Sequence, residues 1–394
     1  MTRKFSFYEF FAGAGMARAG LGNEWECLFA NDVDGVKASA YRENWGKDHF
    51  DDRDIREVSL GDLRTGADLA WASFPCQDLS VAGTGLGIGN ADAADLTRSG
   101  ALWPFLELIK GLRQEERQPP LIVLENVVGL LTLEGGRDFA AICESLGELG
   151  YRYGAVMIDA RHFVPQSRPR VFIVAVQRDT PVPRELDCGI PTAAWHTPSL
   201  LKAYEALSTQ AHTDWIWWHL GTPPKLPDNA LIDAIQFQDI EWDTPEATAR
   251  LIGMMAPTHL TRLEQAKLAG SIQIGSLYLR MRREGSVNKQ RAEITFAPTL
   301  GCLRTPRGGA SRPRIILVEN ERVRTRLLSI DEAAALMGLP TDYLLPQVYY
   351  HAFKIVGDGI AVPVVRFLAE RLLEPLVFAA HSTLCADKLR VACA

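Results

Sequence analysis

The chain has 394 residues, of which 47% are hydrophobic and 23% are charged, a composition typical of a folded globular protein. This length allows two domains, each with its own core. The longest apolar runs, such as 121–124 and 171–176, are far too short to span a membrane, and no signal-peptide pattern opens the chain, so we expect a cytoplasmic protein.

The net charge of −6 alone disfavours a polyanionic partner, but the charges are segregated along the chain. Residues 278–326 hold twelve basic and four acidic residues, whereas residues 228–246 hold six acidic residues and no basic one. The basic stretch is either a solvated strip or a face that binds phosphates.

The cysteines and histidines indicate neither disulfides nor a metal site. The seven cysteines are scattered and never spaced as CxxC, so we expect free thiols. The eight histidines form no HExxH motif and no zinc-type pairing with cysteine, so we predict no metal.

Residues 1–180 alternate short apolar runs with helical patterns, which is typical of βαβ units. The alternation predicts a mostly parallel sheet with helices on both faces. The predicted strands are 6–11, 26–31, 67–74, 121–124, 153–158 and 170–176, and the predicted helices are 16–21, one from about 33, 102–112 and 139–149.

The pattern changes after residue 178. Residues 179–300 contain many prolines and three clustered tryptophans (Trp215, Trp217 and Trp218), without βα alternation, and predict a smaller, irregular domain with the tryptophans in its core. Ser329 and Glu332 form a capping box that predicts a helix to about 337, and Pro363 precedes an amphipathic helix to about 373. We therefore predict domains at 1–180, 181–320 and 321–394, the last returning to the first.

A glycine-rich turn follows the first predicted strand. Gly13 and Gly15 permit a tight turn and close approach of a ligand, and Asp32 ends the second strand, where an acid accepts hydrogen bonds from ribose hydroxyls. The spacing is not GxGxxG, and such turns often bind nothing. At this level dinucleotides, flavins and S-adenosylmethionine all remain open.

Three further motifs follow strands at the same predicted edge of the sheet. Cys76 lies between a proline and polar residues, which favours an exposed nucleophile over a buried thiol. An exposed thiol reacts as the thiolate, so it needs a cationic neighbour to become a nucleophile. Glu125 ends an apolar strand, either facing water or holding a proton. Arg168 and Arg170 lie on the same side of another strand, in surface ion pairs or facing one anion.

Five motifs in this order resemble those of the cytosine C5 DNA methyltransferases. They are FAGAG at 11–15, SFPCQDLS at 73–80, LENV at 124–127, QSRPR at 166–170 and GDGIAVPVV at 357–365. The similarity covers about two thirds of the chain, and the patternless region between the blocks corresponds to the variable target-recognition segment. The resemblance implies a Rossmann-like fold, an S-adenosylmethionine cofactor and transfer of a methyl group to DNA.

The resemblance also implies roles for individual residues. Cys76 attacks C6 of a flipped cytosine, Glu125 contacts N3 and the exocyclic amine, Arg168 lies near O2 and the nucleophile, and Arg170 supports the thiolate. Cofactor contacts are implied for Phe11, Ala12, Gly13, Ala14, Gly15, Met16, Asp32, Val33, Asp54, Ile55, Pro75, Leu102 and Asp358, with Asp51 and Asp52 competing with Asp54. DNA contacts are expected from Gln77, Ser80, Gln166, Arg304, Arg307 and Arg312, and the glycine-rich stretch 83–89 is the expected lid.

One motif departs from the family pattern. The last block usually reads Gly-Asn-Ser-Val, but here it reads Gly357-Asp358-Gly359-Ile360, which puts a carboxylate in place of an amide. Alternative functions are a tRNA cytosine-5 methyltransferase, a non-catalytic cofactor-binding DNA sensor and a nicotinamide-dependent oxidoreductase. The recognition segment of over 100 residues favours DNA, and we expect a monomer acting beside a restriction endonuclease.

Overall fold

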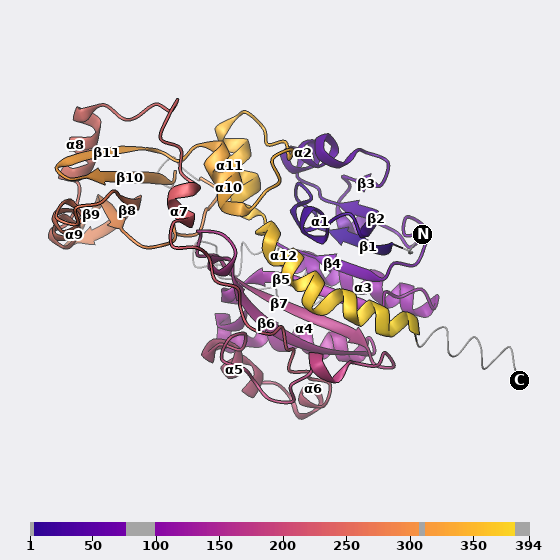
Figure 1. Ribbon diagram of the computed structural model, residues 1–394. Coiled ribbons are helices and arrows are strands. Elements are labelled where there is room, and N and C mark those ends of the chain that lie inside the picture. The colour runs from indigo at the N-terminus through magenta and orange to yellow at the C-terminus, as the bar shows by residue number, and fades with distance from the viewer. Residues whose placement is uncertain (1–3, 76–98, 307–311, 383–394) are drawn as a thin grey trace, which may run out of the picture. The chain divides into compact units, whose positions relative to one another are not determined.

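The computed structural model describes residues 4–75, 99–306 and 312–382. The chain divides into two compact units (Figure 1). The first comprises Met1–Asp159, Pro169–Pro223 and Val364–Ala394, and the second comprises Ala160–Arg168 and Pro224–Pro363. No helix within the described ranges is both long and apolar enough to cross a membrane.

The first unit is built on a seven-stranded sheet in the order β3-β2-β1-β4-β5-β7-β6. Neighbouring strands from β3 to β5 pair in parallel, and β7 runs antiparallel to both β5 and β6, which confirms the mostly parallel sheet. The strands are β1 (Phe5–Phe10), β2 (Trp25–Asn31), β3 (Phe50–Asp51), β4 (Leu69–Ala72), β5 (Leu121–Val127), β6 (Tyr151–Asp159) and β7 (Pro169–Gln177).

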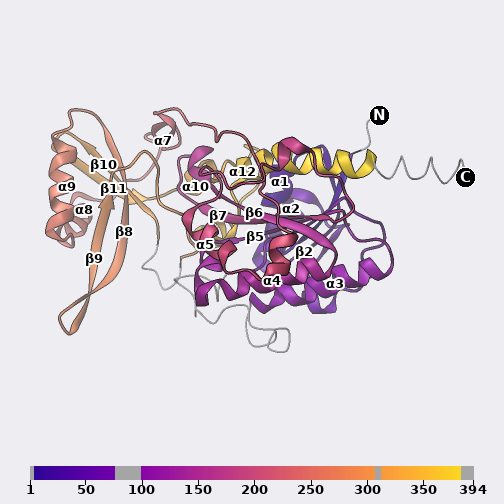
Figure 2. The same cartoon turned by 90° about the horizontal axis from the view of Figure 1, so that it is seen from below.

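Helices cover both faces of this sheet (Figures 1 and 2): α3 and α4 lie on one face, and α1 and α12 lie on the other. The face under α3 and α4 holds a core that includes Phe10, Phe105 and Phe139, all fully buried. The helices are α1 (Met16–Leu21), α2 (Gly35–Trp45), α3 (Leu102–Gln114), α4 (Arg137–Glu148), α5 (Pro198–Glu205), α6 (Thr209–Thr213) and α12 (Val362–Leu368), the last continuing into a π-helical turn, Ala369–Leu373.

The clustered tryptophans correct one expectation, because they pack in the first unit and not in a small-domain core. Trp218 is buried and donates from Nε1 to the carbonyl of Val174 on β7, at 3.0 Å. Gly154 on β6 makes this possible, since a Cβ there would lie 1.9 Å from the carbonyl oxygen of Ile216. Residues 181–223, which the sequence analysis assigned to the recognition domain, thus belong with the large sheet.

The second unit contains a four-stranded antiparallel sheet in the order β11-β10-β8-β9, a regular element where the sequence predicted an irregular domain. Its strands are β8 (Gln273–Glu284), β9 (Val287–Thr295), β10 (Arg314–Glu319) and β11 (Arg322–Leu327). Its helices are α7 (Ala230–Asp233), α8 (Pro245–Gly253), α9 (Pro257–Lys267), α10 (Ile330–Met337) and α11 (Tyr349–Asp358). The predicted capping box of α10 is confirmed.

Candidate active site

The strand order of the large sheet identifies where a ligand binds. From β1 the chain proceeds outward to β2 and β3, whereas β4 and β5 lie on the other side of β1, so the direction of winding reverses between β1 and β4. Ligands of open α/β sheets bind beyond the carboxyl ends of the strands at such a point. Phe10, Asn31 and Ala72 are register partners at these ends, so the glycine-rich turn, Asp32 and Pro75 follow at one edge.

The turn after β1 has the backbone conformation that its glycines predicted. Gly13 and Gly15 have φ angles of 59° and 79°, in the region that favours glycine. A Cβ on Gly15 would lie 2.3 Å from Nε1 of Trp45, whereas a Cβ on Gly13 would meet no atom within 4 Å. Gly15 therefore serves packing, and Gly13 leaves its backbone open to an incoming ligand.

Asp32 is held against this turn by two backbone donors. Its Oδ2 accepts from the amide of Gly13 at 2.8 Å and its Oδ1 accepts from the amide of Asp34 at 2.9 Å. Burial raises the pKa of the Asp32 carboxyl above its ordinary value, and both amides and Lys37 act in the opposite direction. Each oxygen keeps a lone pair for a ribose hydroxyl. Val33, which follows it, is 65% exposed and offers an apolar surface beside the carboxylate.

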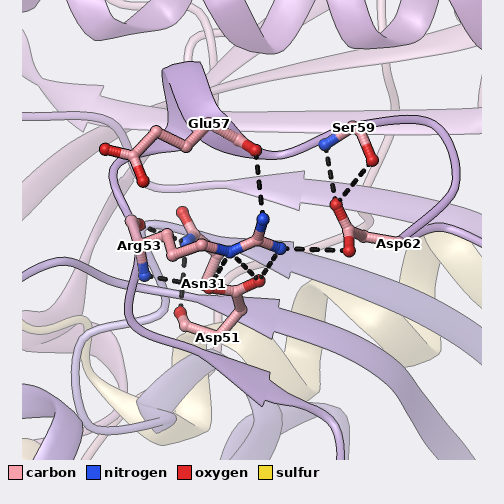
Figure 3. A network of polar contacts seen from close by, with 6 residues as sticks. All are labelled: Asn31, Asp51, Arg53, Glu57, Ser59 and Asp62. Carbon is pink, nitrogen blue, oxygen red and sulfur yellow. Dashed lines mark hydrogen bonds and ion pairs between the residues drawn. The ribbon is translucent and has the colours of Figure 1, made fainter.

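A polar network fixes the loop that follows β3 (Figure 3). Asn31 donates from Nδ2 to the carbonyls of Asp51 and Arg53, at 3.1 and 2.8 Å. The Arg53 guanidinium forms ion pairs with both Asp51 and Asp62. The Asp51 carboxylate is therefore already paired with a cation. The remaining contacts in Figure 3 join Arg53 to the carbonyl of Glu57 and Asp62 to Ser59.

The three acids on this loop that compete for one expected cofactor contact differ in their partners. Asp52 pairs with Arg42, and Asp51 pairs with Arg53. Asp54 caps the 3-10 turn η1 (Ile55–Glu57) by accepting from the amide of Arg56 at 3.0 Å. Ile55 is only 5% exposed and packs in the core.

At the end of β5, Glu125 and Arg170 form an ion pair that is mostly shielded from water. Nε of Arg170 lies 3.2 Å from Oε1 of Glu125, and the two side chains are 13% and 10% exposed. The next residue, Asn126, donates from Nδ2 to the carbonyl of Phe74 at 3.1 Å in a buried contact. Asn126 thereby ties β5 to the segment that leads through the half-buried Pro75 toward Cys76.

Several predicted site residues lie outside the described residues. They are Cys76, Gln77, Ser80, Arg307 and the stretch 83–89.

Arg168 and Gln166 have contacts that differ from the roles implied by the resemblance. Arg168 is 1% exposed, and its guanidinium donates to the carbonyls of Leu303, Gly357 and Gly359, at 2.9, 2.8 and 2.5 Å, and to Sγ of Cys302 at 3.1 Å. A guanidinium held in this way stabilises the backbone of the second unit and is not presented to a base.

Gln166 is fully buried, although we expected it to contact DNA. Its Nε2 donates to the carbonyl of Leu336 at 2.8 Å, and its Oε1 accepts from the amide of Leu303 at 2.9 Å. Both ends of the amide are therefore occupied within the second unit, and the DNA contact is not supported.

The other predicted residues divide between buried and exposed positions. Leu102 is fully buried in the core of the first unit. Asp358 is exposed, and its Oδ1 accepts a hydrogen bond from Oγ1 of Thr305 at 2.7 Å. This contact lies within the second unit. Arg304 and Arg312 are exposed, as a role in DNA binding requires.

Two asparagines with a positioning role were missed in the sequence. Asn31 and Asn126 each follow an apolar strand run, and both are 2% exposed. A buried amide must find hydrogen-bond partners, so an asparagine at the end of a buried strand indicates an attachment to a neighbouring segment. That signal was present beside Asp32 and beside Glu125.

The open turn at Gly13, the Asp32 carboxylate and the exposed Val33 fit a nucleoside cofactor, because they offer free space at a backbone, an acceptor for ribose and an apolar surface. They do not by themselves distinguish S-adenosylmethionine from other nucleosides. Comparison with known proteins makes that distinction.

The family described as C-5 cytosine-specific DNA methylase is matched over residues 5–374. Type II methyltransferase M1.ScrFI of Lactococcus lactis subsp. cremoris is 26% identical over 379 residues, covering 95% of this chain and 79% of the relative. Type II methyltransferase M.HpaII of Haemophilus parainfluenzae is also 26% identical, covering 95% and 91%.

Among solved structures, the S. pombe Dnmt2 methyltransferase superposes with a TM-score of 0.57 at 16% identity, covering 95% of this chain and 99% of that one, which supports the fold. Enzymes of the matched family use S-adenosylmethionine as the methyl donor. The chain belongs to the C-5 cytosine-specific DNA methylase family and is an S-adenosylmethionine-dependent DNA (cytosine-5-)-methyltransferase.

Proposed function

We propose that this protein methylates C5 of a cytosine within a specific duplex DNA sequence, through a transient bond between Sγ of Cys76 and C6 of the base. The observation that carries the proposal is the shielded Glu125–Arg170 pair, next to an asparagine that holds the segment leading to Cys76. A carboxyl group, a guanidinium and a thiol are the groups that nucleophilic attack on a pyrimidine requires.

The proposed chemistry starts with the cysteine. The Cys76 thiolate forms a bond to C6, the electrons of the C5–C6 double bond move to C5, and N3 takes a proton from the Glu125 carboxyl. S-adenosylmethionine supplies the methyl group that C5 then takes. Loss of the C5 proton to a base and cleavage of the Sγ–C6 bond restore the double bond, and N3 returns its proton.

Arg170 is assigned the cationic role that the resemblance divided between two arginines. Its Nε lies 3.2 Å from the Glu125 carboxylate, so it orients this side chain toward the base and places a positive charge where negative charge develops on the ring. Arg168 is assigned a structural role, because its donors are used on carbonyls of Leu303, Gly357 and Gly359.

Asp32 is assigned to the ribose hydroxyls of the cofactor, and Val33 to its adenine. The amide of Gly13 positions the Asp32 carboxylate at 2.8 Å, and the open surroundings of Gly13 admit the cofactor against the turn. The target cytosine must leave the duplex to reach this edge of the sheet, which costs a few kcal/mol of stacking and pairing. Contacts from exposed arginines, including Arg304 and Arg312, offset that cost.

The relatives named type II methyltransferases also support a biological context. We propose that the protein modifies the site of a cognate restriction endonuclease and acts as a monomer. Challenge of DNA from expressing cells with restriction enzymes tests the first statement, and sedimentation of the purified protein tests the second.

The direct test is bisulfite sequencing of DNA from cells that express the protein. We expect 5-methylcytosine at one recurrent sequence, and the Cys76→Ala variant should leave that sequence unmodified while it still binds S-adenosylmethionine. Modification of transfer RNA alone, by the purified enzyme with labelled cofactor, would contradict the proposed substrate. Retained turnover by Cys76→Ala would contradict the covalent step.

A further inference from the structure

The hairpin of β8 and β9 extends beyond the sheet to which it belongs (Figure 2). The pairing of β10 with β8 extends only from the pair Val318–Gln273 to the pair Arg314–Leu277. Residues 278–284 of β8 therefore pair with β9 alone. Residues 278–284 and 287–293 thus form a two-stranded segment, called here the β8–β9 ribbon. A two-residue turn at Gly285, with φ 61°, closes it.

The two faces of the ribbon differ in what covers them. Leu277, Ala292 and Ile294 belong to one face of the sheet and pack in a core with residues of α8 and α9. Side chains alternate between faces along a strand, so Tyr278 and Arg280 point to the opposite face, away from these helices.

That opposite face carries more basic than acidic side chains. Arg280 pairs directly with Arg291, and the next pair on the same face is Arg282 with Lys289. Like charges directly opposite each other destabilise an antiparallel pair. Two such pairs in succession make this face a candidate for binding an anion, unless acids on the same face neutralise them.

The acids on this face compensate only part of the charge. Glu293 lies 3.5 Å from Arg280 and 2.5 Å from Arg282, and Glu284 lies 2.5 Å from Arg291. Two acids thus face four basic residues, and the Arg280 and Arg282 side chains remain 51% exposed.

The basic face continues toward another cation that we assigned to DNA. Tyr278, at the base of the ribbon, lies beneath the Arg280 guanidinium, whose central carbon is 5.6 Å from the ring centroid. Burial raises the pKa of the Tyr278 phenol, and the positive charge of nearby Arg304 acts against this rise. The row of cations thus leads from the tip of the hairpin to the segment of Arg304.

We propose that the β8–β9 ribbon is a DNA-binding arm whose helix-free face contacts backbone phosphates. Two adjacent strands are narrow enough for the major groove of B-form DNA, which is about 12 Å wide and admits a two-stranded ribbon. Contacts of this kind add affinity without sequence preference and place the duplex for readout elsewhere. The inference rests on the proposed DNA substrate.

The test compares two double variants that lose the same charge from the same unit. Arg282→Gln/Lys289→Gln removes one opposed pair from the ribbon, and Arg262→Gln/Lys267→Gln removes two cations from α9, on the helix-covered side. Affinity for short duplexes of unrelated sequence is measured by fluorescence anisotropy at salt concentrations between about 50 and 200 mM.

We expect the ribbon variant to bind every duplex more weakly by a similar factor. The slope of log affinity against log salt should fall by about 1.8, which is about 0.9 for each lost phosphate contact. The thermal midpoint should change little, because the variant loses the half-exposed Arg282–Glu293 ion pair together with the repulsion between Arg282 and Lys289. The α9 variant should retain the wild-type slope.

Two results would overturn the inference. One is a wild-type slope in the ribbon variant, and the other is a loss of affinity that the α9 variant shows equally. Failure of the wild-type enzyme to bind or methylate any DNA would instead contradict the proposed function, so the two failures are distinguishable.

Discussion

Substituting Asn126 with alanine should impair methyl transfer far more than cofactor binding. Asn126 is 2% exposed, and its Nδ2 donates to the carbonyl of Phe74, two residues before Cys76 in the sequence. Loss of this bond detaches the segment after β4 from β5 at the edge of the sheet where the site lies. Asn126 is therefore a positioning residue for the segment that carries the nucleophile.

The expected magnitude follows from the energy of one buried hydrogen bond. Leaving a buried partner unsatisfied costs about 1–3 kcal/mol. If that energy is lost only in the reacting geometry, the single-turnover rate falls by about 5- to 150-fold, at 1.36 kcal/mol for each factor of ten. The affinity for S-adenosylmethionine should stay within about twofold of wild type, because Asp32 and Gly13 are untouched.

The assay is transfer of a labelled methyl group under single-turnover conditions, with cofactor affinity from calorimetry and unfolding free energy from denaturant titration. Gln177→Ala is a matched control, because Nε2 of Gln177 also donates to a backbone carbonyl, that of Gln118, at 3.1 Å. Gln177 follows Val176, the register partner of Leu121 at the start of β5, and so lies at the opposite edge of the sheet. Equal rates for both variants, at equal losses of stability, would refute the reasoning.

Four other variants test the turn after β1 and its surroundings. Gly15→Ala should reduce the unfolding free energy by more than Gly13→Ala, because a Cβ at Gly15 meets Trp45 at 2.3 Å in addition to the roughly 1–2 kcal/mol cost of a left-handed backbone; denaturant titration giving equal losses would contradict this. Asp32→Asn should weaken S-adenosylmethionine binding by roughly 10- to 100-fold, since it removes charge-assisted hydrogen bonds, and calorimetry showing undiminished affinity would exclude the assigned ribose contact. Burial raises the pKa of Glu9 to about 8 from an ordinary 4.5, so the folded state holds this proton more tightly and wild-type stability falls as pH rises through that window. Glu9→Gln should therefore gain stability relative to wild type between about pH 5 and 8, and a pH-independent difference in the denaturation midpoint would contradict it.

Local patterns in the sequence were sufficient to predict the large sheet and the helices beside it. The run that predicted a strand at 121–124 is fully buried in β5, and the helix predicted at 16–21 has those bounds in the structure. Both depend on residues close in the chain, such as the glycines before α1. The capping box of Ser329 and Glu332 is of the same kind, since its two hydrogen bonds lie within one turn.

Roles that depend on distant partners were not predictable in this way. Arg168 was placed near a base by its motif, but its partners are carbonyls of Leu303, Gly357 and Gly359, more than a hundred residues away. The tryptophans near 215 were assigned to the wrong domain because an apolar cluster does not reveal which sheet it packs against. Gly154 indicates the correct sheet, because the absence of a side chain there lets the tryptophan segment pack against β6.

The antiparallel sheet of the second unit was missed for a related reason. Beyond Leu279, β8 carries mostly charged side chains on both faces, so the alternation that predicts a half-buried strand is absent. Toward the tip of the ribbon the core ends, and no hydrophobic pattern remains to be detected there. The succession of basic residues was noticed, but its cross-strand pairing required the structure.

Covalent capture tests most directly whether Cys76 attacks the base. DNA in which 5-fluorocytosine replaces the target cytosine cannot lose a proton from C5, so the bond to Cys76 should persist after methyl transfer. Incubation with enzyme and S-adenosylmethionine, followed by proteolysis and mass spectrometry, should yield a peptide with the methylated base on Cys76. Capture on another residue, or equal capture by Cys76→Ala, would contradict the account.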